Sequence, residues 1–198
     1  MNKPQSNLEN HTRHKPQYKI CVSGGAEGSH AIKAYPLARK VGEAVAKNGH
    51  VLITGATRGV PYEAAKAAKK VGGSNIGFSP AGTEIEHSKK YRLPLSPQIF
   101  DHIIYTEAGY TGRNLLMVRS SDATIMIDGR MGTLNEFTAA YEEDEIIGVL
   151  EGSGGTSDLV RTIIETSGKG LRKVIFDTDP SRLVERIIDR VKKGKRHS

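Results

Sequence analysis

Short aliphatic runs alternate with longer amphipathic stretches along most of the chain. The runs predict strands at YKICVS (18–23), HVLIT (50–54), SNIGFSP (74–80), DHIIYT (101–106), ATIMI (123–127), EIIGVL (145–150) and KVIFD (173–177). The stretches between them predict helices over 36–49, 61–73, 112–121, 157–167 and 180–193, with a further helix from about Thr133. This alternation predicts an α/β fold with a doubly wound, mostly parallel, Rossmann-like sheet of about seven strands.

One domain over 18–192 accounts for the alternation, because no linker or internal repeat interrupts it. We interpret 1–17 as a flexible N-terminal tail and 193–198 as a basic C-terminal tail. The chain has a formal net charge of +7, but most of the excess lies in these tails. The nearly neutral body predicts no basic face for a duplex, so we expect no nucleic acid partner.

The sequence also bears on location and cofactors. No apolar run approaches the roughly 20 residues of a membrane-spanning helix, and the N-terminus has no signal-like apolar region. We therefore expect a cytoplasmic protein with no membrane partner. The single cysteine, Cys21, lies in the first apolar run and is interpreted as a buried, unreactive thiol. The histidines show no metal-ligand spacing, so neither a metal nor another cofactor is expected.

In doubly wound sheets ligands bind beyond the carboxyl ends of the strands, so the loops that follow strands are the candidate sites. SGGAEGS follows the first strand and contains Ser23, Gly24 and Gly25, whose backbone can approach an anion closely. The alternative is a tight turn that needs glycine. The order G-G-x-x-G, with the second strand ending at Thr54 rather than near an acid, argues against NAD.

Two further segments carry arginines at the starts of helices. TGATRGVP places Gly55, Arg58 and Gly59 at a strand-to-helix junction, where a cation can meet an anionic ligand; a solvated arginine is the alternative. In GRNLLMVRSSD, Arg113 begins a helix and lies one turn from Met117. A positive charge at a helix N-terminus is mildly unfavourable, which suggests that Arg113 has a use. Leu115, Leu116 and Val118 in the same helix are core candidates.

The segment DGRMGTLNEF (128–137) joins a strand to a helix. Thr133 and Glu136 have capping-box spacing, which predicts that the threonine accepts from the backbone N–H of Glu136 while the glutamate reaches back. A cap does not require Gly129 and Gly132, however, and glycines there leave room for a phosphate beside the helix N-terminus. We therefore favour ligand binding, with which a cap can coexist.

These motifs carry a family resemblance. GRNLLMVRSSDATIMIDGRMGTLNEF resembles the LONELY GUY, or lysine-decarboxylase-like, family, and VLITGATRGVPYEAAKAAKKVGGSNIGFSP resembles the glycine loop, helix and strand that precede it. The similarity extends from about 18 to 190. The spacing GRN…RSxD…GxxGTxxE is similar to a branch that includes molybdenum cofactor carrier proteins. Asp128 stands where the family has proline, Arg130 where it has a second glycine, and Asn114 where it has lysine.

The resemblance implies a phosphoribohydrolase that cleaves the N-glycosidic bond of a nucleoside 5′-monophosphate, giving a free base and ribose 5-phosphate. It implies that Arg113 and Glu136 are catalytic and that the protein is a homodimer. The alternative is a carrier that binds a nucleotide or the molybdenum cofactor without catalysis. The substrate-binding candidates, taken together, are Ser23, Gly24, Gly25, Gly55, Arg58, Gly59, Met117, Gly129, Arg130, Gly132 and Thr133.

Overall fold

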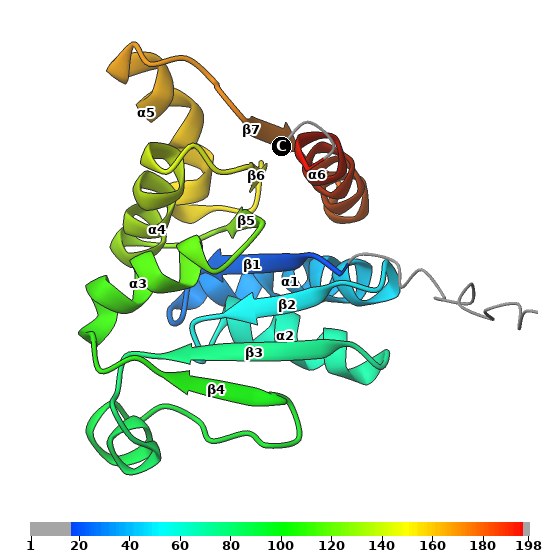
Figure 1. Cartoon of the computed structure of the whole chain (residues 1–198). Coiled ribbons are helices and arrows are strands. Elements are labelled where there is room, and N and C mark those ends of the chain that lie inside the picture. Colours follow the sequence, from blue (N-terminus) through cyan, green and yellow to red (C-terminus); the bar gives the residue numbers. More distant parts are fainter. Residues whose placement is uncertain (1–16, 196–198) are drawn as a thin grey trace, which may run out of the picture.

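A single parallel sheet of seven strands forms the centre of the molecule (Figure 1). The computed structural model describes residues 17–195. The strand order is β4-β3-β2-β1-β5-β6-β7. The strands are β1 (Lys19–Gly24), β2 (Val51–Thr54), β3 (Ser74–Ser79), β4 (His102–Tyr105), β5 (Ala123–Ile127), β6 (Ile147–Leu150) and β7 (Val174–Asp177).

Helices cover both faces of the sheet. The first face carries α1 (Ser29–Lys47), α2 (Val60–Lys70) and α6 (Pro180–Gly194), and the second carries α3 (Gly109–Arg119), α4 (Met131–Glu142) and α5 (Val160–Ser167). A π-helix, η1 (Glu86–Lys90), and a 3-10 helix, η2 (Gly155–Leu159), lie in the connections. The predicted doubly wound, Rossmann-like α/β fold is therefore confirmed.

Alternate residues of each central strand enter the two layers of the core. In β1, Ile20 and Val22 pack with the α1, α2 and α6 layer, whereas Cys21 packs with Ile53 and Met117 on the other face. All these side chains are fully buried or nearly so. Because both faces are covered, the central strands read as continuous apolar runs, which explains why they could be recognised in the sequence.

Several boundaries differ from the predicted ones. Helix α1 starts at Ser29 and continues through Pro36, whereas the sequence pattern predicts that Pro36 begins the helix. Lys193 and Gly194 belong to α6 rather than to a C-terminal tail, and Lys195 is the C-cap residue of that helix. Of the predicted tails, 1–16 and 196–198 lie outside the described residues. Segment 81–100 contains η1. Within residues 17–195, no helix is both long and apolar enough to cross a membrane.

The sheet reverses its winding direction between β1 and β5. The chain builds β2, β3 and β4 outward from one edge of β1, then returns to place β5 along the other edge. Gly24 pairs with Ile127 at the carboxyl ends of these two strands, so the loops that follow them are neighbours. Such a switch point is where doubly wound sheets bind ligands.

Candidate functional site

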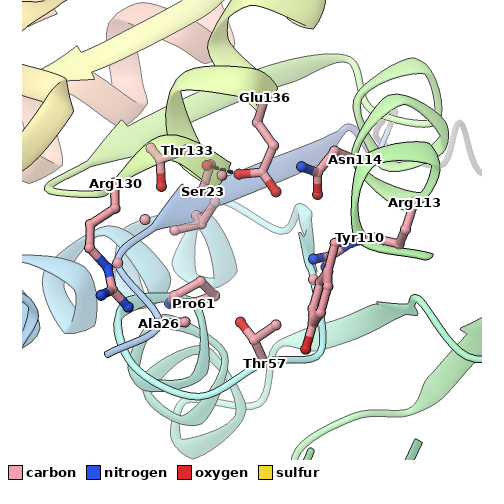
Figure 2. Close-up of a pocket in the computed structure, with 15 residues that line it drawn as sticks. Ser23, Ala26, Thr57, Pro61, Tyr110, Arg113, Asn114, Arg130, Thr133 and Glu136 are labelled. Atoms are coloured by element: carbon pink, nitrogen blue, oxygen red, sulfur yellow. Dashed lines mark hydrogen bonds between the residues drawn. The ribbon is translucent and has the colours of Figure 1, made fainter. Parts of the chain in front are cut away.

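A cavity of about 230 Å³ opens at this switch point, and we call it the switch-point cavity (Figure 2). Figure 2 shows Arg130 at one end, Tyr110 at the other, and Glu136 projecting from α4 between them. Its lining residues are Val22, Ser23, Gly24, Gly25, Ala26, Gly55, Thr57, Pro61, Tyr110, Arg113, Asn114, Arg130, Gly132, Thr133 and Glu136.

Glu136 is a buried carboxyl group on the wall of this cavity. Its side chain accepts a hydrogen bond from the hydroxyl of Ser23, the penultimate residue of β1. Burial raises the pKa of Glu136, while the Arg113 guanidinium and the Ser23 hydrogen bond oppose that rise. Glu136 is only 7% exposed, and it lines the cavity, so the small exposed part of its side chain faces the space that a ligand would occupy.

Arg113, in the second turn of α3, is the buried cation that faces this carboxyl. Its Nη1 donates to the carbonyl of Phe78 at 3.2 Å, and within the described residues its Nε has no hydrogen-bond partner. Burial lowers the pKa of Arg113, and the charge of Glu136 raises it. A β-carbon at Gly55 would overlap the guanidinium, so the absence of a side chain at Gly55 makes room for Arg113.

The N-terminus of α4 forms one end of the cavity. The helix begins at Met131 with Arg130 as its N-cap residue, and no side chain caps it. The predicted capping box is therefore wrong: Thr133 is already inside the first turn, and Glu136 points to Ser23 instead of reaching back. The first backbone N–H groups of a helix have no intrahelical partner, so this end can bind an anion.

Hydrogen bonds from η2 and the residues just before it fix the loop that precedes α4. The backbone carbonyl of Asp128 accepts from the N–H and hydroxyl of Ser157, at 3.0 and 2.5 Å, and its N–H donates to Ser153 at 2.8 Å. Asp128 has a φ of 54°, unusual for a residue other than glycine. Its carboxyl group is buried behind Gly25, where a β-carbon would overlap it, and it does not line the switch-point cavity.

The structure brings nine of the predicted site residues to the cavity wall: Ser23, Gly24, Gly25, Gly55, Arg113, Arg130, Gly132, Thr133 and Glu136. It does not bring four others there. Met117 is fully buried among Cys21, Ile53 and Phe78, because it lies on the core side of α3. Gly59 and Gly129 shape the loops without lining the cavity, and Arg58 lines a neighbouring one.

Sequence reasoning missed several lining residues, namely Val22, Ala26, Thr57, Pro61, Tyr110 and Asn114. Tyr110 precedes Arg113 by one helical turn, which is a signal that periodicity offers. Asn114 donates to Asn135 at 2.9 Å, and its carbonyl oxygen has no partner within the described residues. Leu115 and Leu116 are 38% and 44% exposed, so the prediction that they are core residues is wrong; only Val118 is buried.

Across residues 17–195, no three histidine, cysteine or acidic side chains come together as a set of metal ligands. Cys21 is buried against the sheet, and burial together with the nearby Glu136 raises the pKa of its thiol well above the ordinary range. The titratable groups that meet at the cavity are therefore Arg113 and Glu136, with Tyr110 and Arg130 at its ends.

Comparison with known proteins defines the family. The model of the SLOG cluster4 family matches residues 17–184, so this chain belongs to the SLOG cluster4 family. The predicted resemblance to LONELY GUY-like proteins near the molybdenum cofactor carriers is confirmed. An uncharacterized protein of Archaeoglobus fulgidus is 34% identical over 119 residues, which are 60% of this chain and 72% of that protein.

Two solved structures have a similar fold. The protein TM1055 has a TM-score of 0.73 at 21% identity, over 88% of this chain and 99% of that one. The molybdenum cofactor binding protein from the phototrophic bacterium Rippkaea orientalis has a TM-score of 0.69 at 25% identity, over 91% of this chain and 99% of that one. Both are similar along almost their whole length, so the family fold is present without a large insertion or deletion.

Proposed function

We propose that this protein hydrolyses the N-glycosidic bond of a nucleoside 5′-monophosphate, releasing a free base and ribose 5-phosphate. The observation that carries the proposal is the buried Glu136 carboxyl, held by Ser23 and facing Arg113, on the wall of a cavity at the switch point. A carboxylate in such a place can stabilise the positive charge that develops on ribose as the glycosidic bond breaks.

The cavity has separate ends for the parts of a nucleotide. Gly132 and Thr133, in the first turn of α4, and the exposed Arg130 suit the phosphate. The ring of Tyr110 at the opposite end suits the planar base (Figure 2). Ribose then lies between them, beside Glu136, which is the arrangement that hydrolysis requires.

The proposed step is the hydrolysis of the bond between C1′ of ribose and the base nitrogen. Water attacks C1′, the C–N bond breaks, and its electron pair stays on the base nitrogen. The oxygen of water and one hydrogen remain on C1′ as a hydroxyl, and the other proton passes to Glu136. The base nitrogen takes up one proton, and Glu136 releases the proton that it accepted, so the sum is nucleotide plus water giving ribose 5-phosphate plus base. Glu136, as a carboxylate, orients the water and accepts its proton, while Arg113 favours the charged form of Glu136. Ser23 is a positioning residue that fixes the carboxylate.

The proposal is tested by incubating wild type and Glu136→Gln with a panel of nucleoside 5′-monophosphates and measuring base and ribose 5-phosphate. Wild type should form the two products in equal amounts. Glu136→Gln should lower kcat by about 10² or more, the size expected when one key electrostatic or acid–base group is removed. No base release by wild type from any of these nucleotides would contradict the proposal.

A second candidate is a carrier that binds a nucleotide or the molybdenum cofactor without turnover. Arg130 supports it, because an exposed arginine at the anion-binding end of the cavity strengthens binding whether or not a bond is cleaved. The similarity to a molybdenum cofactor binding protein of Rippkaea orientalis also supports it. In a carrier, Arg130→Ala should weaken binding by about 1.5–3 kcal/mol if a charged hydrogen bond is lost. Calorimetry with AMP and a pterin phosphate tests this, since turnover of AMP defeats it.

We also propose that the protein is a homodimer, as the family resemblance implies. Leu115 and Leu116 on α3 are large apolar side chains that the monomer leaves 38% and 44% exposed. Burying them between two copies would remove apolar surface from water. Light scattering should then give twice the 21.5 kDa mass of the chain, and Leu116→Arg should give the monomer.

A further inference from the structure

A second cavity adjoins the switch-point cavity, and we call it the outer chamber. Its volume is about 490 Å³, and its lining is Ala26, Glu27, Thr57, Arg58, Tyr91, Arg92, Leu93 and Tyr110. Ala26, Thr57 and Tyr110 line both cavities. In Figure 2, Tyr110 stands at the end of the switch-point cavity opposite Arg130. A ligand whose phosphate lies near Arg130 therefore extends toward the outer chamber with its base.

The outer chamber combines aromatic rings with positive charge. The rings of Tyr91 and Tyr110 meet edge to face, with centroids 5.4 Å apart and an interplanar angle of 84°. The exposed side chains of Arg58 and Arg92 make no ion pair with any carboxylate of residues 17–195. Two guanidinium groups beside aromatic rings form a site for a planar group that carries negative charge.

Two further charged side chains near this chamber, Lys90 and Glu27, each have a partner of opposite charge. Lys90 pairs with Glu86 at 2.6 Å. Glu27 lines the chamber and lies 3.8 Å from Arg130, whose positive charge offsets that of Glu27. Arg58 and Arg92 are therefore the cations of the outer chamber that remain available to a ligand.

Arg92 also has an unusual backbone. Its φ of 52° lies in the left-handed region, which side chains other than glycine, asparagine and aspartate adopt rarely. Such conformations are found preferentially at binding and catalytic sites. The conformation of Arg92 therefore agrees with a binding role for this segment.

Building on the function proposed above, we infer that the substrate is a nucleoside 5′-monophosphate whose base carries an anionic substituent, a carboxylate or a phosphate. The base lies against Tyr110, and the substituent enters the outer chamber to pair with Arg58 and Arg92. Arginine binds both anions through two parallel hydrogen bonds, so either one fits. A neutral substituent fills the same space without these bonds and therefore binds less tightly.

The test measures binding by calorimetry in a Glu136→Gln parent, which prevents turnover. The probes are N6-butyl-AMP, N6-(1,2-dicarboxyethyl)-AMP and the N6-(2-phosphooxyethyl) derivative of AMP. The parent should bind at least one anionic probe about tenfold or more tightly than the butyl probe, the effect of a charged hydrogen bond. Adding Arg58→Gln and Arg92→Gln should abolish this preference and change butyl binding by less than about twofold. Which anionic probe is preferred identifies the substituent.

Arg190→Gln is the matched control, because Arg190 is an exposed arginine of α6, away from both cavities, and its loss should change no affinity. Equal binding of all three probes by the parent, equal losses for all three in the double variant, or no binding at all would overturn the inference. Turnover of unsubstituted AMP by wild type separates the two proposals. If wild type turns over a nucleotide but the parent binds the anionic probes no more tightly than the butyl probe, only this inference is wrong. If the parent prefers an anionic probe but wild type turns over none of the probes, only the proposed hydrolase is wrong.

Discussion

The hydroxyl of Ser23 in β1 donates a hydrogen bond to the carboxylate of Glu136 in α4, 113 residues further along the chain. This bond joins the carboxyl end of β1 to α4, beside the switch point. The bond also fixes one oxygen of Glu136. Among residues 17–195, Glu136 is the only acidic residue that lines the switch-point cavity. The proposed reaction depends on the position of this carboxylate, which the first three predictions below test; the fourth concerns the pH dependence of stability elsewhere in the fold.

Ser23→Ala should impair the reaction without preventing binding. The serine bond lowers the pKa of Glu136, so its loss raises that pKa further and moves the acidic limb of the kcat profile to higher pH. We expect kcat to fall about tenfold at neutral pH, with little change in KM, which is less than the roughly 10² expected for loss of the catalytic group itself. Ser121→Ala, which removes a hydroxyl far from the cavity, is the control. An unshifted acidic limb would mean that Ser23 does not act through Glu136.

Glu136→Gln should make the protein more stable while it removes activity. Burial raises the pKa of Glu136 above its unfolded value, so the folded state favours the proton. Ionisation of Glu136 therefore lowers the free energy of unfolding. This loss is absent at a pH below the pKa of Glu136 in the unfolded state and is complete at a pH above its pKa in the folded state. At neutral pH the variant should gain roughly 0.5–2 kcal/mol of unfolding free energy, the range common for single stabilising substitutions. Chemical denaturation measures this, and a less stable variant contradicts it.

Gly55→Ala should displace Arg113. A β-carbon at residue 55 overlaps the guanidinium, and the backbone of Gly55 needs no left-handed conformation, so the effect is steric. A catalytic group moved by about 1 Å can lose roughly 10² in rate, and we expect kcat to fall by that order. Gly194→Ala meets no neighbouring atom and is the matched control. Full activity of Gly55→Ala would show that the position of Arg113 is not needed.

Glu145 should make stability depend on pH in a region away from the cavity. Burial raises its pKa from 4.5 to about 8, against a hydrogen bond from Thr124 at 3.3 Å. The folded state retains this proton longer than the unfolded state, so stability falls as pH rises between 4.5 and 8.

Glu145→Gln should match wild type near pH 4 and exceed its unfolding free energy at pH 9 by roughly 2 kcal/mol, less than the full shift implies because water screens a partly exposed group. Glu185→Gln, an exposed carboxyl of α6, controls for the loss of a surface charge. Parallel pH profiles of wild type and Glu145→Gln would contradict the prediction.

The sheet could be predicted because its strands are buried on both faces. Apolar runs such as ATIMI at 123–127 need no partner to be recognised. Arg113 and Glu136 could also be identified from the sequence, because they occupy matching positions in the motifs that resemble those of the LONELY GUY family. Local rules failed where tertiary contacts compete with them. The spacing of Thr133 and Glu136 matches a cap, yet Ser23 from a distant strand takes the carboxylate.

The same limit applies to side-chain direction. Met117 and Leu116 are adjacent in sequence, but one is fully buried against Cys21 and the other is 44% exposed. Which face of α3 meets the sheet depends on how the helix packs, and a helix with apolar residues on several faces does not reveal this. The outer chamber could not be foreseen, because four segments far apart in sequence form it.

The most direct measurement is the release of base and ribose 5-phosphate from purified protein, followed by chromatography over a panel of nucleoside 5′-monophosphates with and without substituents on the base. We expect wild type to form both products in equal amounts from at least one nucleotide, and Glu136→Gln to form them about 10² times more slowly or worse. Tight binding without products, or equal rates for wild type and Glu136→Gln, would contradict the proposed hydrolase.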